Sequence, residues 1–91
     1  MIIISYDISD DRLRNKFAKY LTKFGHRLQY SVFQIENSER ILKNIIHDLD
    51  NNFSKKFTQS DSVYIFLLSN SCEIKKYGYA RNEDKELIVI K

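Results

Sequence analysis

The first seven residues constrain the fold more than any other part of the chain. Three consecutive β-branched residues, Ile2–Ile4, begin an apolar run that ends at the lone carboxylate of Asp7. A short apolar run rich in β-branched residues and bounded by a turn signal, here Ser9–Asp11, predicts a strand buried on both faces. The chain is therefore expected to fold around residues 1–7, with Asp7 at the C-terminal end of that strand.

A helix is predicted to follow this strand directly. Ser9 or Asp10 can cap its N-terminus, and Gly25 is a natural residue to end it. Its apolar positions recur with the helical period of 3.6 residues: Leu13, Phe17, Tyr20, Leu21 and Phe24. The carboxylates of Asp10 and Asp11 suit the first turn of a helix, which favours negative charge.

Three further elements are predicted before residue 69. Residues 27–36 alternate loosely and indicate one strand or two short strands broken by a kink. A second helix is expected from about Ser38, with its pattern lost at Asn51–Asn52 or a turn later. Residues 62–68 contain an unbroken apolar run, Val63–Leu68, and predict a central strand. The apolar positions of the second helix are Ile41, Leu42, Ile45, Ile46, Leu49 and Phe53.

This order of elements predicts one α+β domain over residues 1–91. The expected architecture is a ferredoxin-like βαββαβ sandwich, with the helices on one face of an antiparallel sheet. The last residues, about 85–91, contain four consecutive apolar side chains that a monomer of this size would have difficulty covering. We expect this segment to be an added strand that pairs with another sheet, in a second copy of the chain.

The charged residues are segregated along the chain. The 24 positions from Arg12 to Ile35 hold six basic residues and no acidic one. On the predicted helix, four of them form a stripe along one flank, while Arg14 projects past the apolar face. A stripe of this kind can be an ordinary solvated face, but the missing acids favour a polyanionic partner, with nucleic acid first. The six residues are Arg12, Arg14, Lys16, Lys19, Lys23 and Arg27, and all but Arg14 and Arg27 belong to the stripe.

Asp7 is the first candidate for chemistry. A carboxylate beside a basic segment is what a metal-assisted phosphodiester site needs. The alternative is that Asp7 ends the strand and accepts backbone hydrogen bonds in the turn that follows. Phe33 is open to two interpretations as well, a core or interface aromatic or a base-stacking one.

The composition predicts a soluble, cytoplasmic protein without a membrane partner. A single cysteine permits no intrachain disulfide, which suits a reducing compartment. No apolar stretch approaches the ~18 residues of a membrane-spanning helix.

Three strings carry a resemblance to a known family: Tyr6-Asp7-Ile8, Leu13-Arg14-Asn15-Lys16 and Gly25-His26-Arg27-Leu28-Gln29-Tyr30-Ser31-Val32-Phe33. The sequence resembles the second CRISPR-associated core protein family, the small dimeric proteins of the spacer-acquisition module. The resemblance covers essentially the whole chain in length and element order, and its specific motifs lie within residues 1–36.

The resemblance implies a ferredoxin-like homodimer. Its two copies of the first-strand acid, here Asp7, face each other across the two-fold axis and share a divalent metal, usually Mg²⁺. Since Mg²⁺ commonly takes one or two carboxylates, one Asp per subunit is a sufficient ligand set only when two copies meet. Lys16 stands where members often have Arg, which keeps the charge but loses bidentate contact. The residues matching positions tied to cleavage or substrate contact are Tyr6, Arg14, Arg27 and Phe33, with Ser31 in the same string.

Two functions follow from the resemblance. Members of the family look like metal-dependent endonucleases acting on single-stranded RNA or on DNA, and also like non-catalytic scaffolds that hold duplex DNA for the CRISPR integrase subunit. In the first case Arg14 or Arg27 would offset the charge that develops at phosphorus, and Tyr6 would have a positioning role. A second resemblance, to small ribonucleases of toxin type, rests on Asp7 alone, and a dimeric partner module that binds no nucleic acid is a third alternative.

Overall fold

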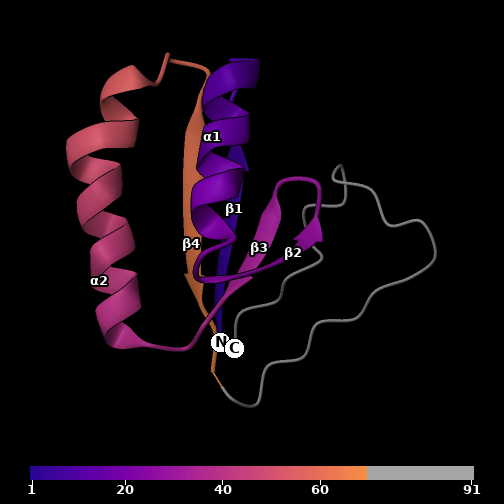
Figure 1. The fold of residues 1–91 in the computed structure, drawn as a ribbon, viewed down its shortest axis with the longest axis vertical. Coiled ribbons are helices and arrows are strands. Elements are labelled where there is room, and N and C mark those ends of the chain that lie inside the picture. The colour runs from indigo at the N-terminus through magenta and orange to yellow at the C-terminus, as the bar shows by residue number, and fades with distance from the viewer. Residues whose placement is uncertain (70–91) are drawn as a thin grey trace.

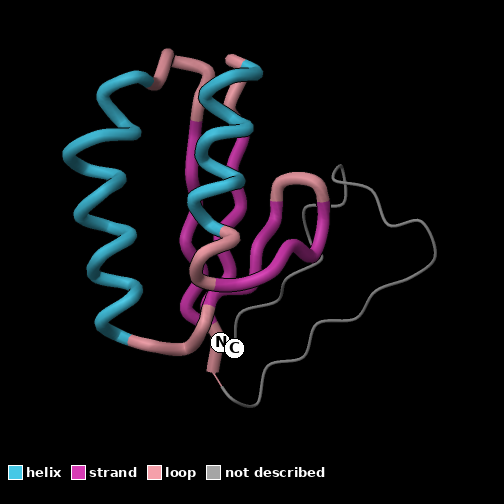
Figure 2. The backbone as a smooth tube through the Cα atoms, in the orientation of Figure 1, coloured by secondary structure: helices cyan, strands magenta, loops and turns pink. Residues whose placement is uncertain are grey.

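The computed structural model describes residues 1–69, which fold as a four-stranded sheet with both helices on one face (Figures 1 and 2). The sheet order is β2-β3-β1-β4 and each neighbouring pair is antiparallel. This arrangement confirms the predicted ferredoxin-like α+β fold. The elements are β1 (Ile2–Asp7), α1 (Asp11–Leu21), β2 (Gly25–Gln29), β3 (Val32–Ile35), α2 (Glu39–Asp48), a π-helical turn (Leu49–Phe53), a 3-10 turn (Ser54–Lys56) and β4 (Ser62–Leu67). The added strand predicted at residues 85–91 lies outside the described residues, so the single domain over 1–91 stays a prediction.

β1 is buried on both faces, as predicted. Ile2, Ile4 and Tyr6 point toward the helices and join the main core. Ile3 points to the other face, where it packs in a second cluster with Leu68. Because β1 lies between β3 and β4, its backbone is hydrogen-bonded on both edges and its position is fixed.

α1 begins where the capping signal predicts. The carboxylate of Asp10 accepts a hydrogen bond from the backbone N–H of Leu13 at 2.8 Å, and the apolar stripe of the helix is buried. The expectation that Gly25 ends this helix is wrong, because α1 ends at Leu21. Gly25 is the first residue of β2, where a Cβ atom would lie 2.0 Å from the carbonyl oxygen of Gln34. Close approach of two strands therefore requires glycine there.

Residues 27–36 take the second of the two predicted forms. β2 and β3 are an antiparallel hairpin joined through Tyr30 and Ser31, with a register irregularity between Arg27 and Gln29. The predicted kink is therefore a tight turn between two short strands.

α2 starts after Ser38, whose hydroxyl accepts a hydrogen bond from the backbone N–H of Ile41 at 3.3 Å. The π-helical turn then carries Phe53 into the core, which explains why the apolar pattern continues past Asn51–Asn52. Ile46, predicted on the apolar face, is 40% exposed.

β4 corrects one further expectation. The segment 62–68 predicts a central strand, whereas β4 is an end strand of the sheet that residues 1–69 form. Val63 and Ile65 pack on the helical side, while Tyr64 is exposed on the other side. Within the same residues, no helix has the length and apolar character needed to cross a membrane.

Candidate active site and nucleic-acid interface

Asp7 is exposed at the C-terminal end of β1, opposite Ser62 of β4. Because successive side chains of a strand alternate between faces, Asp7 lies on the face opposite to Tyr6, which neither helix of residues 1–69 covers. Within residues 1–69, no cationic side chain forms an ion pair with Asp7. Its carboxylate is therefore available to a ligand.

Asp7 is the sequence-predicted metal ligand, and it has no cluster of other ligands around it in residues 1–69. No group of three or more His, Cys, Asp or Glu side chains in the described part of the molecule is placed to hold an ion. Mg²⁺ binds through one or two carboxylates and keeps several waters. Asp7, exposed at the end of β1, fits as a single donor of that type.

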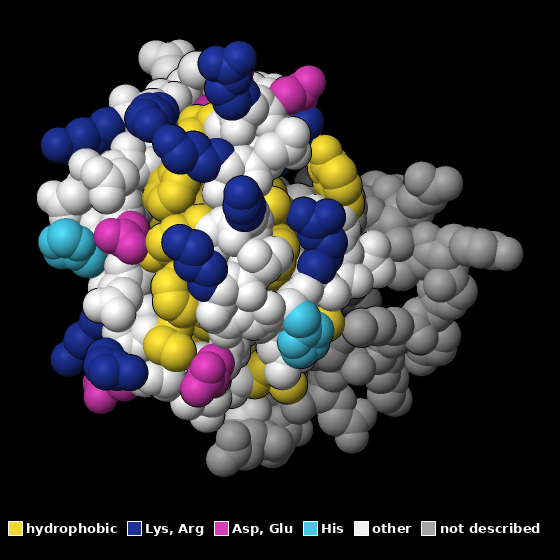
Figure 3. Space-filling view, in the orientation of Figure 1, with side chains coloured by type: hydrophobic (Ala, Val, Ile, Leu, Met, Phe, Trp, Pro, Cys, Tyr) yellow, Lys and Arg dark blue, Asp and Glu magenta, His cyan; other side chains and the backbone are white. Residues whose placement is uncertain are grey.

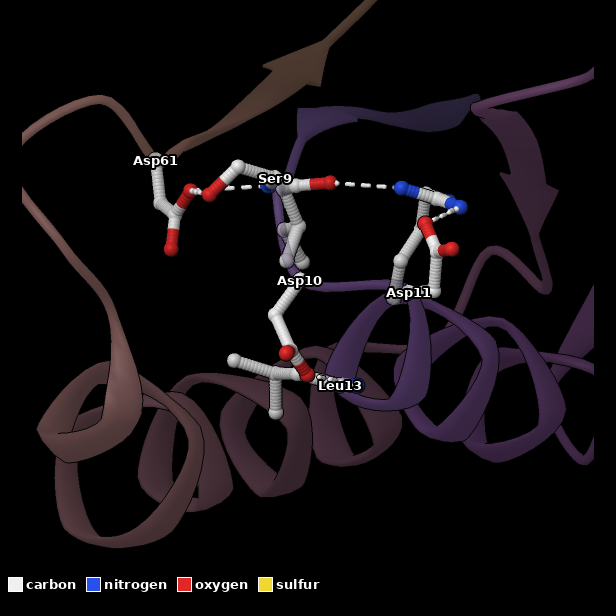
Figure 4. A network of polar contacts seen from close by, with 7 residues as sticks. Ser9, Asp10, Asp11, Leu13 and Asp61 are labelled. Carbon is white, nitrogen blue, oxygen red and sulfur yellow. Dashed lines mark hydrogen bonds and ion pairs between the residues drawn. The ribbon is translucent and has the colours of Figure 1, made fainter.

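The loop that follows Asp7 is anchored on one side by Asp61 (Figure 4). The backbone N–H and the hydroxyl of Ser9 both donate to one carboxylate oxygen of Asp61, at 2.9 and 3.0 Å. The backbone N–H of Thr58 donates to the other oxygen at 2.9 Å. These bonds favour the ionised carboxylate and lower the pKa of Asp61, with the Ser9 backbone as the largest cause. Sequence reasoning missed Asp61, which is 52 residues from Ser9.

Arg14 holds the same loop through the backbone of Ile8. Its guanidinium donates to the carbonyl oxygen of Ile8 at 3.0 Å and pairs with Asp11. The hydrogen bond with Asp11 raises the pKa of Arg14. Arg14 is thus bound to the backbone of the loop next to Asp7. Asp11 pairs with Arg14, whereas Asp10 caps the helix.

Tyr6, Arg27 and Phe33 come together on the helical side of the sheet. The ring of Tyr6 stacks on Phe33 with centroids 6.3 Å apart and meets Phe17 edge-on at 5.1 Å. The Arg27 guanidinium lies 5.2 Å from the centroid of Phe33. Burial raises the pKa of Tyr6, and the charge of Arg27 opposes that effect. Phe33 is fully buried, so its ring supports the core and offers no face to a base.

Ser31 contributes through its backbone. Its carbonyl oxygen accepts a hydrogen bond from the N–H of Tyr6 at 3.1 Å, and its side chain is half-buried. The turn of the β2–β3 hairpin is therefore tied to the residue that precedes Asp7.

The basic stripe lies on the helical face of the molecule. Figure 3 shows Lys and Arg side chains running down the middle of this face, over α1. Arg12, Lys16 and Lys19 are exposed on α1. Lys23 lies in the turn after the helix, since α1 ends earlier than predicted, and its ammonium is 5.9 Å from the ring centroid of Tyr20. Within residues 1–69 none of the four is in an ion pair.

The predicted site residues therefore fall into three places. Asp7 stands at the C-terminal end of β1, where it is exposed. Around the hairpin lie Tyr6, Arg14, Arg27, Ser31 and Phe33. The helical face carries Arg12, Lys16, Lys19 and Lys23.

Residues 1–76 match the family model described as CRISPR associated protein Cas2. The chain belongs to this family. This finding confirms the resemblance that the strings around Asp7, Arg14 and Phe33 carry, and it covers the whole of the described fold.

Individual relatives agree with the family model. A protein named CRISPR-associated endoribonuclease Cas2 from Rhodospirillum rubrum is 31% identical over 83 residues, which are 91% of this chain and 64% of that protein. The chain thus spans slightly less than two thirds of that relative's length. A Synechocystis protein of the same name is 37% identical over 70 residues, 76% of this chain and 72% of its own length. The crystal structure of a hypothetical protein from Thermus thermophilus has a TM-score of 0.64 and 31% identity, covering 85% of this chain and 90% of that one.

Proposed function

We propose that this chain is a nuclease that cleaves phosphodiester bonds in RNA, with Asp7 as the ligand of a divalent metal. The observation that carries the proposal is the exposed Asp7 carboxylate, which has no ion-pair partner in residues 1–69. Asp7 stands at the end of β1, the strand that is hydrogen-bonded to a neighbour on both edges. The relatives named endoribonucleases support the reaction class.

We infer further that the active form contains two copies of the chain, which would supply two Asp7 carboxylates to one Mg²⁺. Support comes from the sheet face opposite to the two described helices, where Val32 and Phe66 pack on the cluster of Ile3 and Leu68 and Tyr64 is 61% exposed. Apolar surface of this kind favours burial against a partner. Two copies meeting through this face would bring the ends of their β1 strands toward a common axis.

The residues of the chain would then have separate tasks. Asp7 would hold the metal, whose chemistry is to polarise a phosphoryl oxygen and lower the pKa of a bound water. Arg27, exposed beside the hairpin, can offset negative charge on the phosphate. Tyr6, buried on the opposite face from Asp7, can act only by positioning Arg27 and the strand.

The test is the substitution Asp7→Asn, which keeps the size of the side chain and removes its charge. With Mg²⁺ present, we expect cleavage of single-stranded RNA to fall by roughly 100-fold or more, since a metal supplies several kcal/mol and about 1.4 kcal/mol is tenfold in rate. The matched control is Asp50→Asn, an exposed acid in the π-helical turn. Equal cleavage by Asp7→Asn and wild type, or cleavage that persists in chelator, would refute the proposal.

A second function is favoured by the basic stripe. We propose that the helical face binds the backbone of duplex DNA, and that the dimer serves as a scaffold for the CRISPR integrase subunit in spacer acquisition. Support comes from four cations without ion-pair partners in residues 1–69, on the face opposite to Asp7. Because phosphate contacts need charge more than fixed geometry, this function does not require Asp7.

A further inference from the structure

Tyr30 is a large aromatic side chain exposed in the turn of the β2–β3 hairpin. It is 55% exposed, whereas its aromatic neighbours Tyr6 and Phe33 are buried. In Figure 1 the turn lies to the side of α1 and is not covered by it. Nothing in the core or in the proposed metal chemistry requires a ring at this position.

The ring of Tyr30 is held on one face by Arg14. The guanidinium carbon of Arg14 lies 5.7 Å from the ring centroid, a cation–π distance. Arg14 is itself fixed, because it donates to the carbonyl oxygen of Ile8 and pairs with Asp11. Because the anchored cation holds the ring in place, the side chain loses little conformational entropy when a ligand binds to the exposed part of the ring.

The turn places the backbone of Tyr30 near that of Asp7. The carbonyl oxygen of Ser31 accepts a hydrogen bond from the N–H of Tyr6, so the turn extends the β1–β3 pairing by one residue. With neighbouring strands ~4.8 Å apart, the backbones of Tyr30 and Asp7 lie on the order of 10 Å from each other. One to three nucleotides bridge that distance, at roughly 3.4 Å or more per nucleotide.

The charge around the ring suits a nucleic-acid strand. Arg14 and Arg27 flank the hairpin, and the acid that contacts this group in residues 1–69 is Asp11, which is already paired with Arg14. An aromatic ring beside cations is the arrangement on which unpaired bases stack. Bases inside a duplex are stacked on each other and do not present their faces.

We propose that Tyr30 is a stacking platform for an unpaired nucleobase beside the β2–β3 hairpin, a contact that favours single-stranded over duplex RNA. The inference rests on the proposed function, since it takes RNA as the substrate. It adds a contact to the base itself, which the metal and the arginines do not supply.

Fluorescence gives a direct test, because the chain contains no Trp. Tyr30→Trp introduces a single indole reporter at the proposed contact. Leu67→Trp is the control, at a position of similar exposure, 61%, that pairs with Ile2 at the other end of β1 from Asp7. Both variants also carry Asp7→Asn, so that RNA is not cleaved during titration.

We expect a single-stranded oligouridylate to quench the indole fluorescence of the Tyr30→Trp variant, because an unpaired base stacks on the ring. A duplex RNA of equal length should leave that fluorescence unchanged, and neither RNA should affect the Leu67→Trp variant. Equal quenching of the Tyr30→Trp variant by both RNAs, or quenching by neither, overturns the inference.

Binding measurements provide a second readout. Base stacking on an aromatic side chain corresponds to roughly 5- to 150-fold in affinity, so Tyr30→Ala is expected to weaken single-stranded binding within that range. Tyr30→Phe should retain wild-type affinity because it keeps the ring. If Tyr30→Ala binds single-stranded RNA as tightly as wild type, the stacking role of Tyr30 is wrong, whatever the effect of Asp7→Asn on cleavage. If Tyr30→Ala loses this binding while Asp7→Asn still cleaves, the platform stands and the metal ligand is wrong.

Discussion

The end of β1 and the stripe on α1 are both charged, but the protein holds them differently. The loop beyond Asp7 is fixed by Asp61 on one side and Arg14 on the other. The stripe residues on α1 are exposed and have no ion-pair partners in residues 1–69. A metal ligand needs a defined position, whereas contacts with a phosphate backbone tolerate mobile side chains. The position of the side chain therefore matters most for Asp7, whereas the stripe residues contribute mainly their charge.

The largest effect expected from the stripe is on duplex binding. Replacing Arg12, Lys16, Lys19 and Lys23 by Gln should reduce the salt dependence of duplex DNA affinity by about 0.9 in log–log slope for each phosphate that is no longer neutralised. At 50 mM salt the affinity should fall on the order of 100-fold, even if the change affects only two phosphates. Titrations at several salt concentrations measure both quantities.

The control for this prediction is a second quadruple variant, which changes the net charge by the same amount at positions outside the stripe. Arg40, Lys43, Lys55 and Lys56 are exposed cations on α2 and the turns that follow it. Their replacement by Gln should leave the slope nearly unchanged. Equal decreases in the two quadruple variants would show that net charge, and not the position of the stripe, governs binding.

Asp61 provides a test of whether cleavage depends on the position of the loop beyond Asp7. Asp61→Ala removes the acceptor for Ser9 and Thr58, so the loop beyond Asp7 is expected to move. Cleavage of single-stranded RNA should fall by roughly 10- to 100-fold, because small displacements of a reacting group have effects of that size. Duplex binding through the stripe should not change.

The control for Asp61 is Tyr20→Phe, which removes the hydrogen bond from the Tyr20 hydroxyl to Asp48, between the helices and away from Asp7. That variant should cleave at the wild-type rate. A similar loss of cleavage in both variants would indicate general destabilisation in place of a local effect on Asp7.

Sequence reasoning identified the elements better than the contacts between them. The capping signals of Asp10 and Ser38 and the alternation around Tyr6 are local, so the strand, the helix starts and the opposite facing of Tyr6 and Asp7 could be predicted. The role of Gly25 could not, because it depends on the strand that passes beside it.

The same limit applies to the candidate site. Asp7 is recognisable from its place at the end of an apolar run and from the family strings. The link between Ser9 and Asp61 joins residues 52 positions apart and leaves no local pattern. Phe33 could be assigned to the core only once its burial was known, because an aromatic in a strand suits a core and a binding surface equally.

Removal of either helix cap should have a smaller effect on stability, and only one of the two substitutions should also affect cleavage. Asp10→Ala and Ser38→Ala each remove a side-chain acceptor at a helix N-terminus and should each lower the free energy of unfolding by about 1 kcal/mol. Only Asp10 belongs to the loop beyond Asp7, so only Asp10→Ala should also slow RNA cleavage. Urea unfolding together with a cleavage assay separates these two results. Slower cleavage in Ser38→Ala would mean that cleavage follows overall stability.

The smallest effect concerns acid pH. The hydrogen bonds from Ser9 and Thr58 lower the pKa of Asp61 in the folded protein, so the fold favours the ionised carboxylate. Asp61 therefore stabilises the protein above its unfolded pKa of about 3.9, and this contribution is lost as the pH falls through the lower, folded pKa. The difference in urea midpoint between wild type and Asp61→Asn should be constant from about pH 5 to 8 and should narrow below about pH 4. The corresponding difference for Ser38→Ala, whose hydroxyl does not titrate in this range, should not vary in the same way. A gap for Asp61→Asn that stays constant into strong acid would show that the loop beyond Asp7 is held by the shape of the Asp61 side chain and not by its charge.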